Sequence, residues 1–173
     1  MVLQTEKWDY FELSLSSDFV GNPFIDVDLT VTFTYKNRSF TVDGFYDGNN
    51  IFKARLMPDE IGMWQYKTHS NIDALDGQTG ELECIPPSDD NHGPVRVVDA
   101  CHFAYEDGTP YHPVGTTCYV WNHQGDELEE QTLRTLKSAP FNKMRMCVFP
   151  KRYVFNKNEP PFYPFEGEVT REW

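Results

Sequence analysis

Residues 27–35, VDLTVTFTY, alternate apolar and polar side chains almost without interruption. A period of two places the apolar side chains on one face of a β-strand and the polar ones on the other. A helix cannot use this pattern, because it would scatter the apolar side chains around its axis. The stretch therefore predicts a strand with one buried and one solvated face. The apolar residues are Val27, Leu29, Val31, Phe33 and Tyr35.

Similar short runs occur on both sides of this strand. KWDYFELSL precedes it, and SFTVD, IFKARLM, MWQYKTHS and GQTGELECI follow, separated by turn signals such as the Asp47-Gly48 pair. Six or seven short strands with no convincing helix predict a mainly β fold, an antiparallel two-sheet β-sandwich. Its expected core residues are Val31, Phe33, Phe52, Leu56, Trp64 and Tyr66.

The pattern changes after residue 86. Residues 85–94, IPPSDDNHGP, have a linker composition, and residues 95–113 suggest a short hairpin that turns at Asp107-Gly108. A strand is then expected within residues 114–121. The one convincing helix follows, with a capping box of Asp126 and Glu129 at its start and Pro140 at its end. FNKMRMCVFP, residues 141–150, reads as a buried strand, so this part predicts a right-handed crossover unit of a parallel sheet.

A crossover unit needs neighbouring strands. About 60 residues follow position 114, against about 250 in a closed (β/α)₈ barrel. We therefore expect the chain to be the N-terminal part of a longer protein. Unpaired strand edges also predict one of two outcomes for residues 110–173: self-association into a homo-oligomer through this region, or poor order within it.

Several segments, in this order, carry a resemblance to a known family. GNPFIDVDLTVTF, RLMPDEIGMWQY, NHGPVRV, FAYEDGTPYHPVGTTCYVWNHQ and FNKMRMCVFPK resemble glycoside hydrolases of the apiosidase-like family. There, an immunoglobulin-like N-terminal domain of unknown function precedes a cellulase-like TIM barrel. The resemblance implies an immunoglobulin-like β-sandwich at residues 1–86, a linker and hairpin at 87–113, and the truncated start of a catalytic barrel at 114–173. It further implies that the complete enzyme hydrolyses O-glycosyl bonds of a carbohydrate substrate.

Arg145 stands in the middle of the predicted buried strand, where a guanidinium is costly without a carboxylate partner. It could pair with a local acid or extend to the strand end. The resemblance implies a different role, because FN-x-x-R is similar to a motif of retaining glycosidases whose arginine hydrogen-bonds the nucleophilic carboxylate. The two catalytic carboxylates would lie on later strands, so this chain alone is not expected to be active.

Five further residues are candidates for contacts with substrate. Trp121 and His123 follow the first predicted barrel strand, at the face where such barrels keep their active sites. Trp121 could stack on a sugar ring or simply pack in a core, and His123 could hydrogen-bond a hydroxyl group. Lys151, Arg152 and Tyr153 occupy the equivalent end of the second strand and could line the same cleft.

Composition excludes other partners. The net charge of −12 and a pI near 4.7 argue against nucleic acid or an anionic membrane surface. No secretory signal or membrane span is visible, so the cytoplasm is the expected location. The four cysteines form no C-x-x-C pair and read as buried reduced thiols. A zinc site built from them and nearby histidines would match no known ligand spacing, so no metal and no cofactor is expected.

A second function remains open at this point. An aromatic-rich sandwich could also be a stand-alone carbohydrate-binding or scaffolding module. Continuation of the native reading frame past Trp173 into further strand–helix repeats would separate the two hypotheses.

Overall fold

The computed structural model describes residues 3–148, 154, 156 and 157. The chain divides into two compact units, Met1–Tyr111 and His112–Trp173. None of the described helices combines the length and the apolar character needed to cross a bilayer.

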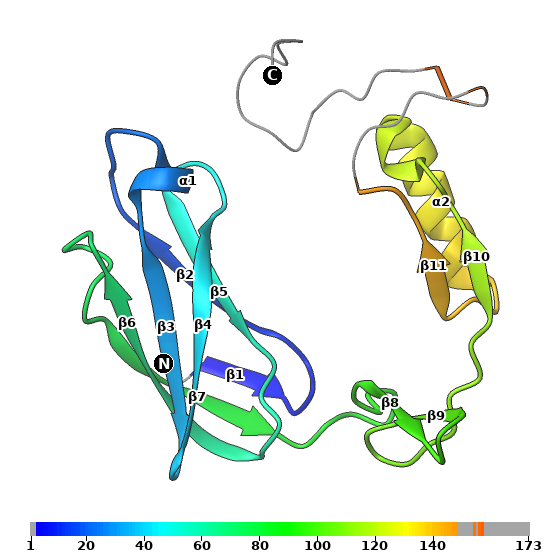
Figure 1. The fold of residues 1–173 in the computed structure, drawn as a ribbon, viewed down its shortest axis with the longest axis horizontal. Coiled ribbons are helices and arrows are strands. Elements are labelled where there is room, and N and C mark those ends of the chain that lie inside the picture. The colour runs from blue at the N-terminus through cyan, green and yellow to red at the C-terminus, as the bar shows by residue number, and fades with distance from the viewer. Residues whose placement is uncertain (1–2, 149–153, 155, 158–173) are drawn as a thin grey trace. The chain divides into compact units, whose positions relative to one another are not determined.

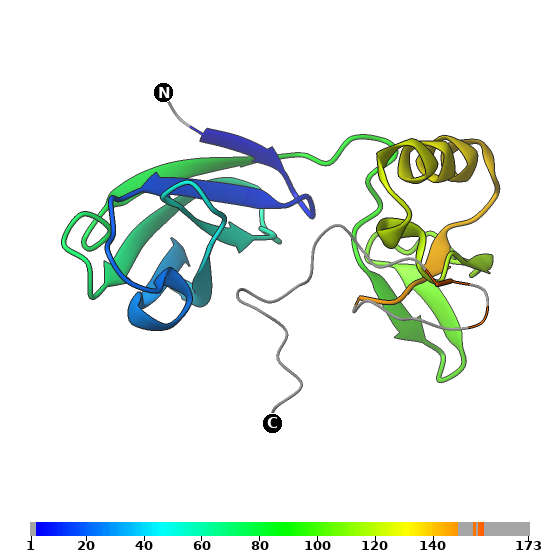
Figure 2. The same cartoon turned by 90° about the horizontal axis from the view of Figure 1, so that it is seen from above.

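The first unit contains one seven-stranded sheet in the order β1-β7-β6-β3-β4-β5-β2 (Figure 1). Its strands are β1 (Leu3–Glu6), β2 (Phe11–Ser16), β3 (Leu29–Tyr35), β4 (Arg38–Tyr46), β5 (Ile51–Leu56), β6 (Gly62–Ser70) and β7 (Thr79–Ile85). The mainly β prediction is confirmed, and β3 covers most of the alternating stretch. The strands form one strongly curled sheet rather than two separate ones (Figure 2).

The sequence predicted purely antiparallel strands, and this prediction was wrong for one pair. β1 pairs with β7 in parallel, with Leu3 opposite Leu82, whereas every other pairing in this sheet is antiparallel. β1 and β2 therefore form the two edges of the sheet, although only residues 7–10 separate them in the chain. Curling is required, because such a short connection must join both edges.

The core lies inside the curl. Five of the six predicted core residues are buried, and Tyr66 is half-buried against the same cluster. Side chains from five strands meet there, since the inward positions of β2, β5, β3, β6 and β7 all contribute. The main cluster consists of Phe11, Leu13, Val31, Phe33, Ala54, Leu56, Trp64, Leu82 and Cys84.

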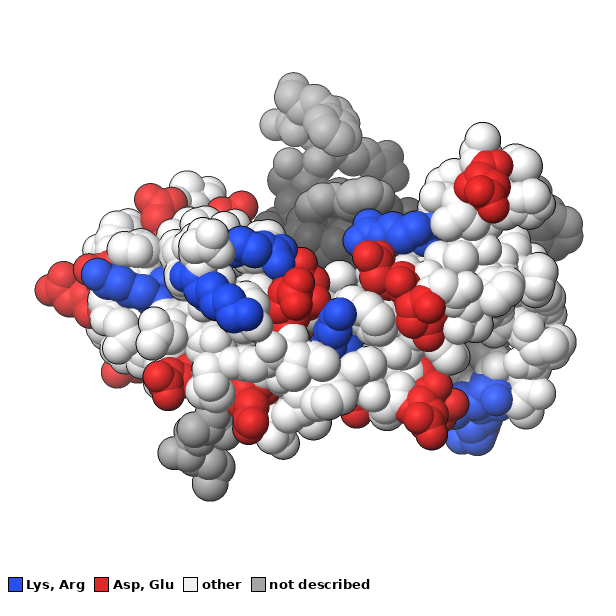
Figure 3. All heavy atoms as spheres, turned by 90° about the horizontal axis from the view of Figure 1, so that it is seen from below, with Lys and Arg blue, Asp and Glu red and all other residues white. Residues whose placement is uncertain are grey.

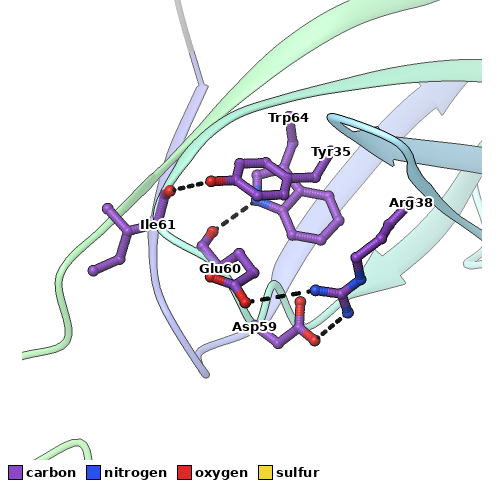
Figure 4. Close-up of polar contacts among 6 residues, drawn as sticks. All are labelled: Tyr35, Arg38, Asp59, Glu60, Ile61 and Trp64. Atoms are coloured by element: carbon purple, nitrogen blue, oxygen red, sulfur yellow. Dashed lines mark hydrogen bonds and ion pairs between the residues drawn. The ribbon is translucent and has the colours of Figure 1, made fainter.

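Trp64 is fully buried and its indole anchors the connection between β5 and β6 (Figure 4). Its Nε1 donates to the Glu60 carbonyl at 2.9 Å, and Tyr35 stacks on it with ring centroids 5.1 Å apart. The Tyr35 hydroxyl donates to the Ile61 carbonyl at 2.9 Å. Arg38 closes the arrangement through an ion pair with Asp59 at 2.6 Å. The connection is thus held by side chains on two other strands.

A short helix that the sequence did not predict, α1 (Pro23–Asp26), precedes β3. Asn22 caps it by accepting a hydrogen bond from the Phe24 amide at 3.0 Å, and Pro23 takes the first helical position. Asp26 accepts from the Asn22 amide at 2.8 Å. These local bonds fix a turn too short to show a helical period.

The linker-like segment is fastened to the sheet. One carboxylate oxygen of Glu6 accepts from the Ser88 amide and hydroxyl, both at 2.9 Å, and from the Asn91 amide group at 3.3 Å. The backbone bond from Ser88, followed by the two side-chain bonds, lowers the pKa of Glu6. Gly93 lies where an added Cβ would overlap the Trp8 ring, so no larger residue fits there without movement.

The predicted hairpin is more elaborate than expected. β8 (Val95–Val98) and β9 (His102–Tyr105) pair in antiparallel fashion. Their turn contains Asp99 and Ala100, both with positive φ (47° and 62°). Glycine usually marks such a turn in a sequence, and neither position has one, so the sequence did not indicate it. The chain also turns at Asp107-Gly108, as predicted, and Ala104 bridges Pro110.

The second unit contains the predicted strand–helix–strand arrangement. β10 (Gly115–Thr117) pairs in parallel with β11 (Lys143–Arg145), and α2 (Asp126–Ser138) connects them after the 3₁₀ turn η1 (Trp121–His123). Figure 1 shows the two strands side by side with α2 running beside them. Both strands are shorter than predicted.

The predicted start of α2 was wrong by one residue. Gly125, with φ of 86°, is the N-cap, and Asp126 is already helical. Within the described part of the chain no side chain makes a capping hydrogen bond to this helix, so the capping box of Asp126 and Glu129 does not form. Instead the Glu129 amide donates to the Gly125 carbonyl at 3.1 Å. The acidic first turn still complements the helix dipole.

Candidate functional site

The candidate site lies at the carboxyl ends of β10 and β11. The backbone ladder continues beyond both strands, because the Cys118 amide donates to the Arg145 carbonyl at 3.1 Å and the Cys147 amide donates to the Tyr119 carbonyl at 2.6 Å. The residues that follow β10 and β11 are therefore side by side. This edge of a parallel sheet is where ligands of such folds bind.

Trp121 and His123 are both in η1, directly after β10. Trp121 is half-buried, and its Nε1 lies 3.3 Å from the Met146 sulfur, so its ring packs toward the segment after β11. His123 is only 7% exposed. Among the described residues, nothing bonds its Nδ1 or the buried Oδ1 of Asn122. Buried polar atoms normally have partners, so both atoms keep unused hydrogen-bonding capacity.

Gln124 and Asn156 complete the polar cluster. The Gln124 amide group donates to the Val120 carbonyl at 3.1 Å and to the Asn156 Oδ1 at 3.0 Å. Asn156 is 4% exposed, so a residue 32 positions later in the chain is held against the segment after β10. The site is thus partly built within this unit.

Arg145 is the last residue of β11, opposite Thr117 in the parallel register. Its side chain is exposed, which differs from the burial expected for this strand, while Met144 beside it is half-buried. Among the described residues no carboxylate forms an ion pair with it. The local-acid explanation for this arginine therefore finds no support in the described part of the chain.

Sequence reasoning gave Asn142 no role, although it is the second residue of the FN-x-x-R motif. Its Nδ2 donates to the His112 carbonyl at 3.0 Å, and its Oδ1 accepts from the Val114 amide at 2.8 Å. Asn142 thus ties the starts of β10 and β11 together at the end opposite the candidate site. A polar amide just before a strand, able to donate and accept at once, is the sequence signal that could have found it.

The other sequence candidates divide into two groups. Lys151, Arg152 and Tyr153 lie outside the described residues. The cysteines are all free, but only Cys84 is buried, and Cys101 is exposed, so the prediction of four buried thiols was wrong. Within residues 3–148, 154, 156 and 157, no cluster of three or more His, Cys, Asp or Glu side chains could hold a metal.

The surface charge is mixed. On the face shown in Figure 3, lysine and arginine side chains are interspersed with aspartate and glutamate. No continuous basic surface, of the kind that binds a nucleic-acid backbone, is visible on that face.

Comparisons with known proteins give three results. Residues 4–71 match the family model of DUF5060, a domain of unknown function. No curated protein matches the chain. One solved structure, described as a "putative glycoside hydrolase from Bacteroides vulgatus ATCC 8482", matches with a TM-score of 0.89 and 48% sequence identity over 95% of this chain. The match covers 32% of that protein, so this chain is similar, over nearly all its length, to about a third of it.

Proposed function

We propose that this chain is the N-terminal part of a retaining glycoside hydrolase of the apiosidase-like kind, in which an immunoglobulin-like accessory unit precedes a cellulase-like (β/α)₈ barrel. The observation that carries the proposal is the 48% identity to a protein described as a "putative glycoside hydrolase", across both units of this chain. The complete enzyme would hydrolyse an O-glycosyl bond in a carbohydrate.

The second unit supports the barrel. A parallel strand pair joined by a helix is the repeating unit of a (β/α)₈ barrel, and β10, α2 and β11 have this arrangement. Large apolar side chains of this unit remain exposed, which suits packing against further barrel elements. Among them are Leu128 at 45%, Leu133 at 38%, Phe141 at 41% and Val148 at 67%.

In the proposed mechanism the two carboxylates come from later strands, because the residues directly after β10 and β11 include no acid before Asp126 or within 146–148. One carboxylate attacks the anomeric carbon while the other protonates the leaving oxygen, and water then hydrolyses the glycosyl-enzyme with the roles of acid and base exchanged. Arg145 is a positioning residue. Its guanidinium would hold the nucleophile ionised and oriented by hydrogen bonds.

Substrate contacts at the same strand ends would come from Trp121 and His123. The Trp121 indole is held by Met146 and is only half-buried, and it is proposed to stack on a sugar ring. The Nδ1 of His123, which no described residue bonds, is proposed to hydrogen-bond a hydroxyl or another barrel residue. Lys151, Arg152 and Tyr153 are proposed to line the cleft from the second strand.

The test uses the enzyme from the continuous native reading frame. Hydrolysis is measured with p-nitrophenyl glycosides and by reducing-sugar release from plant polysaccharides. Arg145→Ala should lower kcat by about 10²-fold or more with a smaller change in KM, because the arginine acts on the nucleophile. Arg145→Lys should restore little, since an ammonium lacks the planar fork of donors.

Arg134→Ala is the matched control, because it removes the same charge from the exposed surface of α2. It should leave kcat and KM unchanged. Circular dichroism checks that each variant folds. Full turnover in Arg145→Ala would show that this arginine has no role in positioning the nucleophile, and absence of glycoside hydrolysis by the whole reading frame would refute the proposed function itself.

A further inference from the structure

The outer surface of the sheet in the first unit carries a groove that the candidate site does not use. It spans β3, β6 and β7 and has a volume of about 510 Å³. Its wall includes Thr32, Thr34, Gln65, Lys67, Thr79 and Glu81. From this groove we infer a second binding site in the molecule, which takes a short segment of an uncharged polysaccharide.

The strand register arranges these side chains in two rows. Thr34 lies opposite Gln65, which lies opposite Glu81, and Thr32 lies opposite Lys67, which lies opposite Thr79. These positions alternate with the buried ones along each strand, so the rows point away from the core. Three adjacent strands therefore present hydroxyl, amide, ammonium and carboxylate groups toward one groove.

The hydroxyl groups in the groove are held in place. The Thr32 Oγ1 lies 3.0 Å from the Thr41 Oγ1, and the Thr34 Oγ1 lies 3.1 Å from the Ser39 Oγ. Each hydroxyl keeps further hydrogen-bonding capacity after one such bond. Threonine is also stiff at χ1, and strands position side chains more rigidly than loops do. The polar groups are consequently preorganised for a ligand.

The charge of the groove indicates the ligand. Lys67 and Glu81 carry opposite charges, and neither forms an ion pair with any described residue, so these two side chains bring both signs to the groove and their charges cancel. The whole chain has a net charge of −12. A neutral ligand with many donors and acceptors complements this composition, and polysaccharide hydroxyls supply both. The choice of carbohydrate rests on the proposed function.

The groove also indicates how tightly the ligand is held. Its volume falls within the range of about 300–1,000 Å³ usual for small-molecule sites. Among the described residues that line it, Tyr66 is the one Phe, Trp or Tyr. Its ring packs against Phe11 and Phe33, with ring centroids 6.4 and 5.9 Å apart, so it offers no stacking platform. Hydrogen bonds alone give weak binding. Weak binding to a polymer still raises the local concentration of substrate for a catalytic unit on the same chain.

The experiment is native gel electrophoresis of this chain through gels that contain a soluble polysaccharide. The neutral probes are xyloglucan, galactomannan, arabinoxylan and mixed-linkage β-glucan, and polygalacturonate serves as an anionic probe. We expect retardation in at least one neutral gel. Gln65→Ala should weaken the apparent association by about two- to tenfold, as the loss of one hydrogen-bonding side chain implies, and Gln65→Ala combined with Thr34→Val should weaken it further.

Both substitutions leave the charge unchanged, so mobility in plain gels is not altered. Gln131→Ala, on the exposed surface of α2, is the matched control and should bind like the wild type. Absence of retardation in every neutral gel, retardation in polygalacturonate alone, or equal retardation of the groove variants would each overturn the inference. Binding is measured without hydrolysis. An active enzyme with no binding in the groove refutes only this inference, and binding without hydrolysis refutes only the proposed function.

Discussion

Replacing Thr68 with valine would remove one hydroxyl from the interior of the first unit while keeping the shape of the side chain. Thr68 is fully buried in β6. Its Oγ1 donates to the Leu75 carbonyl at 2.5 Å and accepts from the Gln78 amide at 2.9 Å. Two backbone bonds of the same loop, from the Thr68 amide to the Gln78 carbonyl and from the Gly77 amide to the Thr68 carbonyl, do not need the hydroxyl.

The cost follows from the two groups that lose a partner. Leu75 is fully buried, so its carbonyl would lose a hydrogen bond where water is excluded, at about 1–3 kcal/mol. Gln78 has an exposed side chain, and water can replace part of the bond to its amide, so this loss is about 0.5–1.5 kcal/mol. Thr68→Val should therefore lower the free energy of unfolding by about 1.5–4.5 kcal/mol, the sum of the two losses.

Urea denaturation followed by circular dichroism measures this loss. With a slope of about 2 kcal/mol per molar urea, the middle of the usual range, the midpoint should fall by about 1–2 M. Thr41→Val is the matched control, because Thr41 makes its hydroxyl contact with Thr32 on the exposed surface. It should cost no more than about 0.5 kcal/mol. Equal midpoints for the two variants would show that the Thr68 hydroxyl does not hold the loop between β6 and β7.

Three other predictions follow from single residues. Burial raises the pKa of Cys84 to about 11, so alkylation of the native chain near neutral pH, read by mass spectrometry, should label the exposed Cys101 and spare Cys84. Gly44→Ala should cost about 1–3 kcal/mol in thermal or urea unfolding, because its Cβ would lie 2.5 Å from a methyl group of the buried Leu29. The folded pKa of Glu6 lies below its ordinary 4.5, so its contribution to stability is present above that pH and is lost as pH falls through the folded pKa. The stability difference between wild type and Glu6→Gln should accordingly shrink on acidification, and a constant difference would contradict the assignment.

Strand positions in the first unit were predictable because alternation is a local property. Val31 and Phe33 in β3 show their burial through their immediate neighbours in the sequence. The pairing of β1 with β7 was not predictable in this way. It joins Leu3 to Leu82, and no local pattern records a partner so distant in the chain. The curled single sheet was missed for the same reason.

The candidate site was predictable in position but not in detail. The end of the first predicted strand located Trp121 and His123, since barrel sites lie at strand ends. The burial of His123 and the bond from Gln124 to Asn156 depend on how the chain folds back, which spacing does not encode. The start of α2 was misjudged because Asp126 is a more usual N-cap residue than Gly125. The structure uses Gly125, with its positive φ, as the N-cap, and Asp126 is the first helical residue.

The position of β1 and β2 at the two edges of one sheet affects how the protein is made. A ribosome releases these strands first, yet β1 must wait for β7, whose synthesis lies about 80 residues later. At about 5–20 residues per second this delay lasts about 4–16 s. Such distant pairing implies a high contact order and slow folding. Until both early strands dock, β7 and β5 each present an unpaired edge to other chains. Removal of the first 16 residues would leave both edges permanently unpaired. The first segment to be synthesised therefore supplies the strands that cover the two edges of the sheet.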